Sequence, residues 1–259
     1  MQGWWHYFSR AVPGIGAAMV NIANLNLLVE ATNDAYVQEG GMSLAFRRVF
    51  NSQSAHNATN GDGSGFGLYG NRWTNNLDVH LGWAPGKSNL GTVSVYTADG
   101  ARNDYSCQIN TVAVCASQTP GVHDLLATTN LGSGVGCELQ LTTKSGVDYI
   151  FDAPYQCATN PVGMYGKLLA IWGRNITFSI QLSYGFGGNP SSPENLAKIV
   201  ATHEPDGAQL VLHFGQIAGT TTNELMTLTR PDGEVVDYEY DTSGDLTGVD
   251  KPGNDPVLA

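Results

Sequence analysis

Hydrophobic residues recur along this chain in short runs with every second position apolar, and helical spacing is scarce. Runs of four to eight residues are separated by clusters of Gly, Asn, Asp and Pro, the residue types that tight turns require. Many short strands with frequent turns are typical of an all-β domain. The clearest predicted strands are 25–30, 43–50, 77–83, 92–96, 148–151, 176–182, 209–214 and 234–240.

This pattern predicts a twisted antiparallel sheet of short strands and hairpins, with a small irregular or helical segment at the N-terminus. The helix candidates are residues 4–10 and a glycine-interrupted stretch at 15–22. Stretches 52–72 and 116–136, rich in Gly, Asn and Ser, are predicted to be long loops, and the tail after residue 253 is predicted to be frayed. A chain of 259 residues can bury a sizeable core without metals.

The most informative feature is an internal repeat. A Pro-Asp-Gly motif occurs twice, twenty-six residues apart, and each copy predicts a turn because Pro presets φ while Asp and Gly suit the following positions. Alternate residues of the strand after each turn share one face, which we expect to be the buried face. The turn residues are Pro205, Asp206, Gly207, Pro231, Asp232 and Gly233, and the repeat-core residues are Leu210, Leu212, Phe214, Val236, Tyr238, Tyr240, Leu246 and Val249.

A looser copy of the motif begins earlier, where Asp99-Gly100 is followed by Tyr105. For such early copies an alternative stays open, because hairpins in many β proteins share Asp-Gly turns. The last two copies agree in turn, spacing and face, which favours a true repeat.

The closing copy resembles the tyrosine-aspartate (YD) repeat of bacterial RHS proteins and of the animal teneurins. The resemblance lies in the turn at 231–233, then Tyr238-x-Tyr240-Asp241, then Gly244-x-Leu246. Residues 24–29, 44–52 and 70–73 also resemble the segment that introduces the repeats in RHS proteins. Asp245 stands where the family usually has arginine.

The resemblance implies a β-sheet that spirals into a hollow shell, which encloses a C-terminal toxin in bacteria or serves adhesion in teneurins. It also implies an order of parts: an aromatic N-terminal plug at 1–24, an RHS-introducing β segment at 25–90, and degenerate to clear YD repeats at 91–259. The chain has one clean repeat and lacks the family's closing Asp-Pro-x-Gly motif. We therefore expect the N-terminal portion of a longer protein, or a truncated relative.

Charge and cysteine content narrow the partners and the compartment. The net charge is −11 with only 12 scattered Lys and Arg, which argues against nucleic acid and anionic membrane surfaces as partners. Four cysteines in a loop-rich region favour disulfides and an extracellular or cell-surface location, with unpaired thiols as the alternative. We favour Cys107–Cys115 and Cys137–Cys157 among the three connectivities. No signal peptide is visible, so the export route stays open.

The chain offers little catalytic or cofactor chemistry. Gly65-x-Gly67-x-x-Gly70 matches a dinucleotide fingerprint but follows a polar loop and precedes no helix, so loop glycines are the better interpretation. Residues 60–64, with Asp62, lack the acidic ligand that ends a calcium loop. We expect no enzyme, cofactor or metal. Glu30, Asp34 and Glu39 are treated as neighbours by chance, and only a cleft that collects two or more carboxylates with His80 or His123 would indicate an enzyme.

Aromatic residues and the last strands suggest partners. Trp4, Trp5, Tyr7 and Phe8 crowd the N-terminus, and they either dock into the core as a plug or contact a partner. Trp73, Trp83 and Trp172 are expected in the core, and if they were exposed and grouped they would indicate a glycan-binding adhesin, the alternative function. A growing sheet ends in an unpaired edge, so we expect the strand at 234–240 or 246–249 to pair with further repeats, another chain, a fibre or homo-oligomer neighbour, or its own tail.

Overall fold

The computed structural model describes residues 7–13, 15–22, 24–39, 42–54, 68–83, 92–107, 114–130, 138–152, 165–174, 179–188, 195–204, 206–220, 223–253 and 257–258. Every helix or strand within these ranges is a β-strand, which confirms the all-β prediction. The strands are β1 Tyr7–Val12, β2 Gly16–Asn21, β3 Asn26–Ala31, β4 Ala35–Glu39, β5 Met42–Phe46, β6 Arg48–Asn51, β7 Trp73–Asn75, β8 His80–Trp83, β9 Thr92–Tyr96, β10 Arg102–Ser106, β11 Val114–Ser117, β12 Leu125–Asn130, β13 Glu138–Thr142, β14 Asp148–Asp152, β15 Tyr165–Gly166, β16 Leu168–Trp172, β17 Ser179–Phe186, β18 Leu196–Glu204, β19 Gln209–Gln216, β20 Asn223–Thr229, β21 Val235–Tyr240, β22 Leu246–Asp250 and β23 Val257–Leu258.

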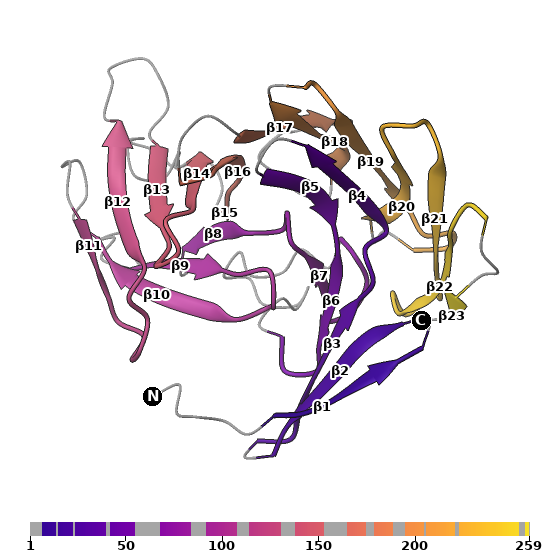
Figure 1. The fold of residues 1–259 in the computed structure, drawn as a ribbon, viewed down its shortest axis with the longest axis horizontal. Helices are drawn as coiled ribbons and strands as arrows, with labels where there is room; N and C mark the ends of the chain where they lie inside the picture. The colour runs from indigo at the N-terminus through magenta and orange to yellow at the C-terminus, as the bar shows by residue number, and fades with distance from the viewer. Residues whose placement is uncertain are drawn as a thin grey trace.

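These strands form three sheets, and every strand pair in them is antiparallel. The largest has sixteen strands in the order β15-β8-β9-β10-β11-β12-β13-β14-β16-β17-β18-β19-β20-β21-β22-β23, the second has the order β1-β2-β3-β6-β7, and β4 pairs with β5. The large sheet curves around the molecule from β8–β10 through β12–β14 and β17–β19 to β20–β22, and β4–β7 lie inside the curve (Figure 1).

One interrupted strand links both ends of the first half of the large sheet. β15 pairs with β8 through Tyr165↔Gly82 and Gly166↔Leu81. After Lys167 the same segment continues as β16, which pairs with β14 on one side and with β17 on the other. The series from β8 to β14 is therefore joined back to its start, and the later strands extend from this junction.

The helical prediction for the N-terminal segment is wrong where the structure describes it. Residues of 4–10 and 15–22 fall in β1 and β2, which pair from Tyr7↔Asn21 to Val12↔Gly16. β2 also pairs with β3 along its whole length, so its backbone groups are bonded on both sides, whereas a helix of this length is marginal in water. The boundary at 24/25 lies in the turn between β2 and β3 of this sheet. A second correction concerns 116–136, since β12 occupies part of that expected loop.

One turn geometry recurs four times in the described chain. At 97–101, 143–147, 230–234 and 241–245 the first residue's N–H donates to the fifth residue's carbonyl, and the fourth residue's N–H donates to the first residue's carbonyl. The fourth residue is always a glycine with φ between 75° and 86°, as expected for a type I turn closed by a left-handed residue. The 203–208 turn is similar but one residue longer, with Gly207 at φ 76°.

A large apolar side chain enters the core five residues after each of these glycines. These residues are Tyr105, Phe151, Leu212, Tyr238 and Val249, and each is at most 3% exposed. The turn therefore sets which strand face points inward, in the early hairpins as well as in the late ones.

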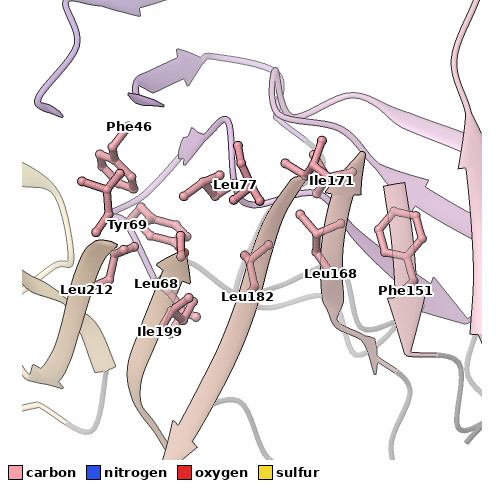
Figure 2. Packing of buried hydrophobic residues seen from close by; sticks show 14 of the residues in the cluster. Phe46, Leu68, Tyr69, Leu77, Phe151, Leu168, Ile171, Leu182, Ile199 and Leu212 are labelled. Atoms are coloured by element: carbon pink, nitrogen blue, oxygen red, sulfur yellow. The ribbon is translucent and has the colours of Figure 1, made fainter. Parts of the chain in front are cut away.

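The core lies between the curved sheet and an inner segment, the described residues of 35–79. Figure 2 shows Phe46, Leu68, Tyr69 and Leu77 lying against side chains from the sheet strands. The sheet contributes Leu212, Ile199, Leu182, Leu168, Ile171 and Phe151 to this view. The inner segment thus fills a concave face that the sheet alone would leave exposed to water.

We expect Leu212→Ala to lower the free energy of unfolding by about 2–5 kcal/mol, because Leu212 is fully buried and its truncation leaves a cavity. The neighbouring His213→Ala is the matched control, since His213 is exposed on the opposite face of β19 and should change stability by no more than about 0.5 kcal/mol. Urea unfolding measures both variants, and equal losses would contradict the assignment of the two faces.

Candidate functional site

A buried ionic cluster joins the two ends of the described chain. Asp34, between β3 and β4, is 0% exposed. Its carboxylate accepts hydrogen bonds from Arg48 Nε at 2.6 Å and from the Tyr238 hydroxyl at 2.9 Å, and it pairs with Lys251 Nζ at 2.8 Å. The Asp34 carbonyl also accepts a 2.8 Å bond from Arg230 Nε. N-terminal Asp34 and Arg48 are therefore held against the last two hairpins.

The electrostatics of this cluster favour the charged forms of Asp34 and Arg48. Burial alone would raise the pKa of Asp34, but the neighbouring Arg48 and Lys251 outweigh that effect and hold the pKa below its ordinary value. The Arg48 guanidinium also lies 5.1 Å from the Trp73 ring and 5.7 Å from the Tyr238 ring, within the range of cation–π attraction. Trp73 and Tyr238 thus contribute to the interior by packing against the Arg48 guanidinium.

A second connection ties residues 68–71 to the C-terminal strands. Glu224 Oε2 accepts a 2.8 Å hydrogen bond from the Gly70 N–H, and the Leu225 N–H donates to the Leu68 carbonyl at 2.6 Å. The Asn71 N–H donates to the Gly244 carbonyl at 2.9 Å. Burial raises the pKa of Glu224 to about 8, and the bond from Gly70 only partly counters this. The Glu224 carboxyl is therefore largely protonated at neutral pH.

The structure places most of the predicted repeat residues where the repeat implies. Leu210, Leu212, Phe214, Val236, Tyr238, Leu246 and Val249 are buried in one cluster, and Tyr240 packs against it. Asp206, Gly207, Pro231, Asp232 and Gly233 lie in exposed turns, while Pro205 lies outside the described residues.

One of the two favoured disulfides is present. Cys107 and Cys115 are bonded between β10 and β11, with their Cα atoms 4.3 Å apart. Cys137 and Cys157 lie outside the described residues, so their pairing stays a prediction.

The other predicted features have mixed outcomes. Phe8 is 77% exposed, so this residue does not dock into the core as the plug required. Trp4 and Trp5, the side chains of Tyr7 and Trp83, and Asp62, Gly65 and Gly67 lie outside what the structure describes, whereas Trp172 is half-buried. β22 pairs with the chain's own tail through Gly248↔Leu258 and Val249↔Val257.

The described residues form neither a metal-binding cluster nor a membrane-spanning helix. Within the described ranges, no three His, Cys, Asp or Glu side chains come close enough to hold a metal ion. The same ranges contain no helix with the length and apolar character to span a bilayer.

A cleft of about 510 Å³, lined by both polar and apolar residues, opens at one end of the large sheet. Because neighbouring strands alternate in direction, the connections β9–β10, β11–β12 and β13–β14 leave the sheet at the same end, and the cleft is lined from all three. Its lining includes Asp99, His123, Asp124 and Tyr149, so it meets the condition of two carboxylates and a histidine that would indicate an enzyme.

Both cleft carboxylates already bind local backbone. Asp99 Oδ1 accepts a hydrogen bond from the Ala101 N–H at 3.2 Å, and Asp124 Oδ1 accepts one from the Lys144 N–H at 3.0 Å. One oxygen of each carboxylate therefore holds a turn, which favours a binding surface of fixed shape over a mobile acid–base pair.

Sequence reasoning missed the Asp34 cluster, the Glu224 contact and the cleft. Asp34 and Lys251 are 217 residues apart, so no spacing rule connects them. One sequence signal does point to the 143–147 turn that lines the cleft. Gly146 and Phe151 repeat the Gly-x4-aromatic spacing of Gly100 and Tyr105.

Comparison with protein-family models found no match for this chain, and comparison with curated proteins found no significant match.

We expect Asp34→Asn to destabilise the fold by about 3–5 kcal/mol, because it leaves Arg48 and Lys251 buried without their counter-charge. Asp232→Asn, an exposed turn acid, should stay within about 0.5 kcal/mol of the unmodified protein. Chemical denaturation measures both. An Asp34→Asn variant as stable as the Asp232→Asn control would refute the role of the cluster.

Glu224 predicts a pH dependence of defined sign. The folded pKa, about 8, exceeds the ordinary value of 4.5, so the unfolded chain releases this proton first and stability falls as pH rises from 4.5 to 8. Glu224→Gln should remove this component and raise the free energy of unfolding at pH 8, because the amide oxygen can still accept the Gly70 bond. Denaturant midpoints measured across this pH range check it, and parallel curves for the two proteins would contradict the prediction.

Proposed function

We propose that this chain is a non-catalytic structural portion of a secreted or surface RHS-type YD-repeat shell or β fibre. The observation that carries the proposal is the recurrent turn, in which the fifth residue after the turn glycine is buried in the core. This unit occurs in the last hairpins, where the sequence clearly resembles the YD repeat, and also at 97–105 and 143–151, where any resemblance is looser. A unit that recurs in one continuous sheet is the expected basis of a wall built by repetition.

The curvature of the sheet and its filled interior also support a wall. The N-terminal segment, which resembles the RHS-introducing motif, supplies Phe46, Leu68, Tyr69 and Leu77 to the concave face. The Asp34 cluster then holds that segment against the last hairpins. A toxin-type cargo or surface adhesion would follow from the same family resemblance.

The edge of the sheet gives the direction of growth. Among the described residues β23 is the last strand at this end, and it pairs with β22 through Gly248↔Leu258 and Val249↔Val257. Further repeats, or another chain, can extend the sheet here by taking the place of this two-residue strand beside β22, with homo-oligomers or fibres as the outcome for the isolated chain.

The test is electron cryomicroscopy of the full-length gene product purified from its source cells, combined with protease accessibility on intact cells. We expect the β22 edge to continue into further antiparallel strands that close a wall, and the protein to be cleaved by external protease. A gene product in which no strand adds to β22, or one that resists protease until the cells are lysed, would refute the proposal.

A further inference from the structure

The cleft lies where two copies of the repeat unit lack a fully buried residue three positions after the turn glycine. The 203–208 and 230–234 turns place the fully buried Leu210 and Val236 at this position, whereas the 241–245 turn places the exposed Thr247 there. The corresponding residues of the two early copies are Asn103 and Tyr149, which are half-buried and line the cleft. Positions where a sequence departs from its own structural rule are those where function is expected.

The hydroxyl of Tyr105, a residue that does not line the cleft, has no partner among the described residues. Tyr105 shares the strand face of Asn103, two residues further along β10, and it is 0% exposed. Its hydroxyl has no hydrogen-bond partner in the part of the chain that the structure describes, although buried polar groups are nearly always satisfied. Burial, and then the charge of the cleft residue Asp124, raises the pKa of Tyr105 to about 12, so the phenol is a neutral donor.

The walls of the cleft are held in place by the surrounding elements. The 97–101 turn is bound to the second sheet, since Asn51 Nδ2 donates to the Asp99 carbonyl at 2.6 Å and Thr74 Oγ1 donates to the Ala98 carbonyl. The 118–124 connection is bound to β10 by a 2.7 Å bond from the Gln118 N–H to the Asp104 carbonyl. A cleft of fixed shape loses little conformational entropy on binding a ligand.

We propose that this cleft is a binding site for a neutral saccharide. The lining combines a buried apolar floor, Val79 and Leu141, with the Tyr149 ring and with amide, carboxylate and hydroxyl groups from Asn103, Asp124 and Thr143. A sugar ring presents the same combination, with C–H faces that pack on apolar and aromatic surfaces and hydroxyls that both donate and accept. The volume lies within the range of about 300–1,000 Å³ for small-molecule sites.

Other ligand classes fit less well. The cleft holds two carboxylates, Asp99 and Asp124, against one lysine, Lys144, and the whole chain has a net charge of −11, so acidic sugars and phosphates are repelled. Metal ions are disfavoured because no group of three acidic, His or Cys ligands forms in the described ranges. This inference is independent of the proposed shell function, because a structural wall needs no such cleft.

The experiment is saturation-transfer NMR and calorimetric titration of the intact chain with four probes: maltose, lactose, chitobiose and digalacturonic acid. We expect at least one neutral disaccharide to bind in the millimolar range or tighter, and digalacturonic acid not to bind. Absence of transfer from all three neutral sugars at millimolar concentrations, or preference for the acidic one, would overturn the proposal. Hydrolysis of the bound sugar would instead contradict the non-catalytic assignment above.

Three variants separate binding from folding. Asn103→Leu restores the apolar residue of the later copies and should weaken binding at least about tenfold while the chain stays folded. Tyr105→Phe should change neither binding nor the melting temperature, because the hydroxyl it removes is fully buried, does not line the cleft and has no partner among the described residues. Asp232→Asn is the matched control, since Asp232 occupies in the 230–234 turn the position that Asp99 has in 97–101, away from the cleft. Binding that survives Asn103→Leu, or that falls equally in Asp232→Asn, would refute the site.

Discussion

This fold depends on the ionic cluster around the buried Asp34 carboxylate, which holds the N-terminal segment against the last hairpins. Two cations and a tyrosine hydroxyl converge on the carboxylate, from β6, from β21 and from the segment after β22. A charge removed from water in this way is costly unless its partners are all in place. The cluster therefore favours one arrangement of the N-terminal segment against the last hairpins and penalises others. The Glu224 contact with Gly70 lies in the same region. There the buried carboxyl is kept neutral by a bound proton, and no cation pairs with it.

Between these two ends the sheet repeats one structural unit, a hairpin turn followed by a strand with an inward-facing residue. A turn glycine with positive φ closes each hairpin, and the period of two along a strand then determines which side chains meet the interior. The same unit occurs in hairpins with little sequence in common, such as 97–101 and 230–234. Backbone geometry is thus more strictly repeated than side-chain identity, which explains why a wall can be built from degenerate copies.

Beside the cleft, two early copies of this unit carry half-buried residues at a position that is fully buried in two of the later copies. Asn103 and Tyr149 occupy positions that hold Leu210 and Val236 in later copies. Asn103 gives up apolar contact there, whereas Tyr149 is half-buried and still packs against the core. The rest of those hairpins keeps the rule, since Tyr105 and Phe151 remain fully buried. The cleft is therefore present without a loss of buried side chains in the core beneath it.

The sequence by itself determined the fold class, the turns that contain Gly207 and Gly233, and the inward face of β19 and β21, because turn chemistry and strand period are local properties. It also favoured the Cys107–Cys115 bond, which joins neighbouring strands. Only the tertiary structure decided that β1 and β2 are strands, since β3 supplies the hydrogen bonds that override weak local preference. It alone brought Asp34 to Lys251 and assembled the cleft from three connections, because such contacts depend on how the sheet curves and no local pattern encodes that curvature.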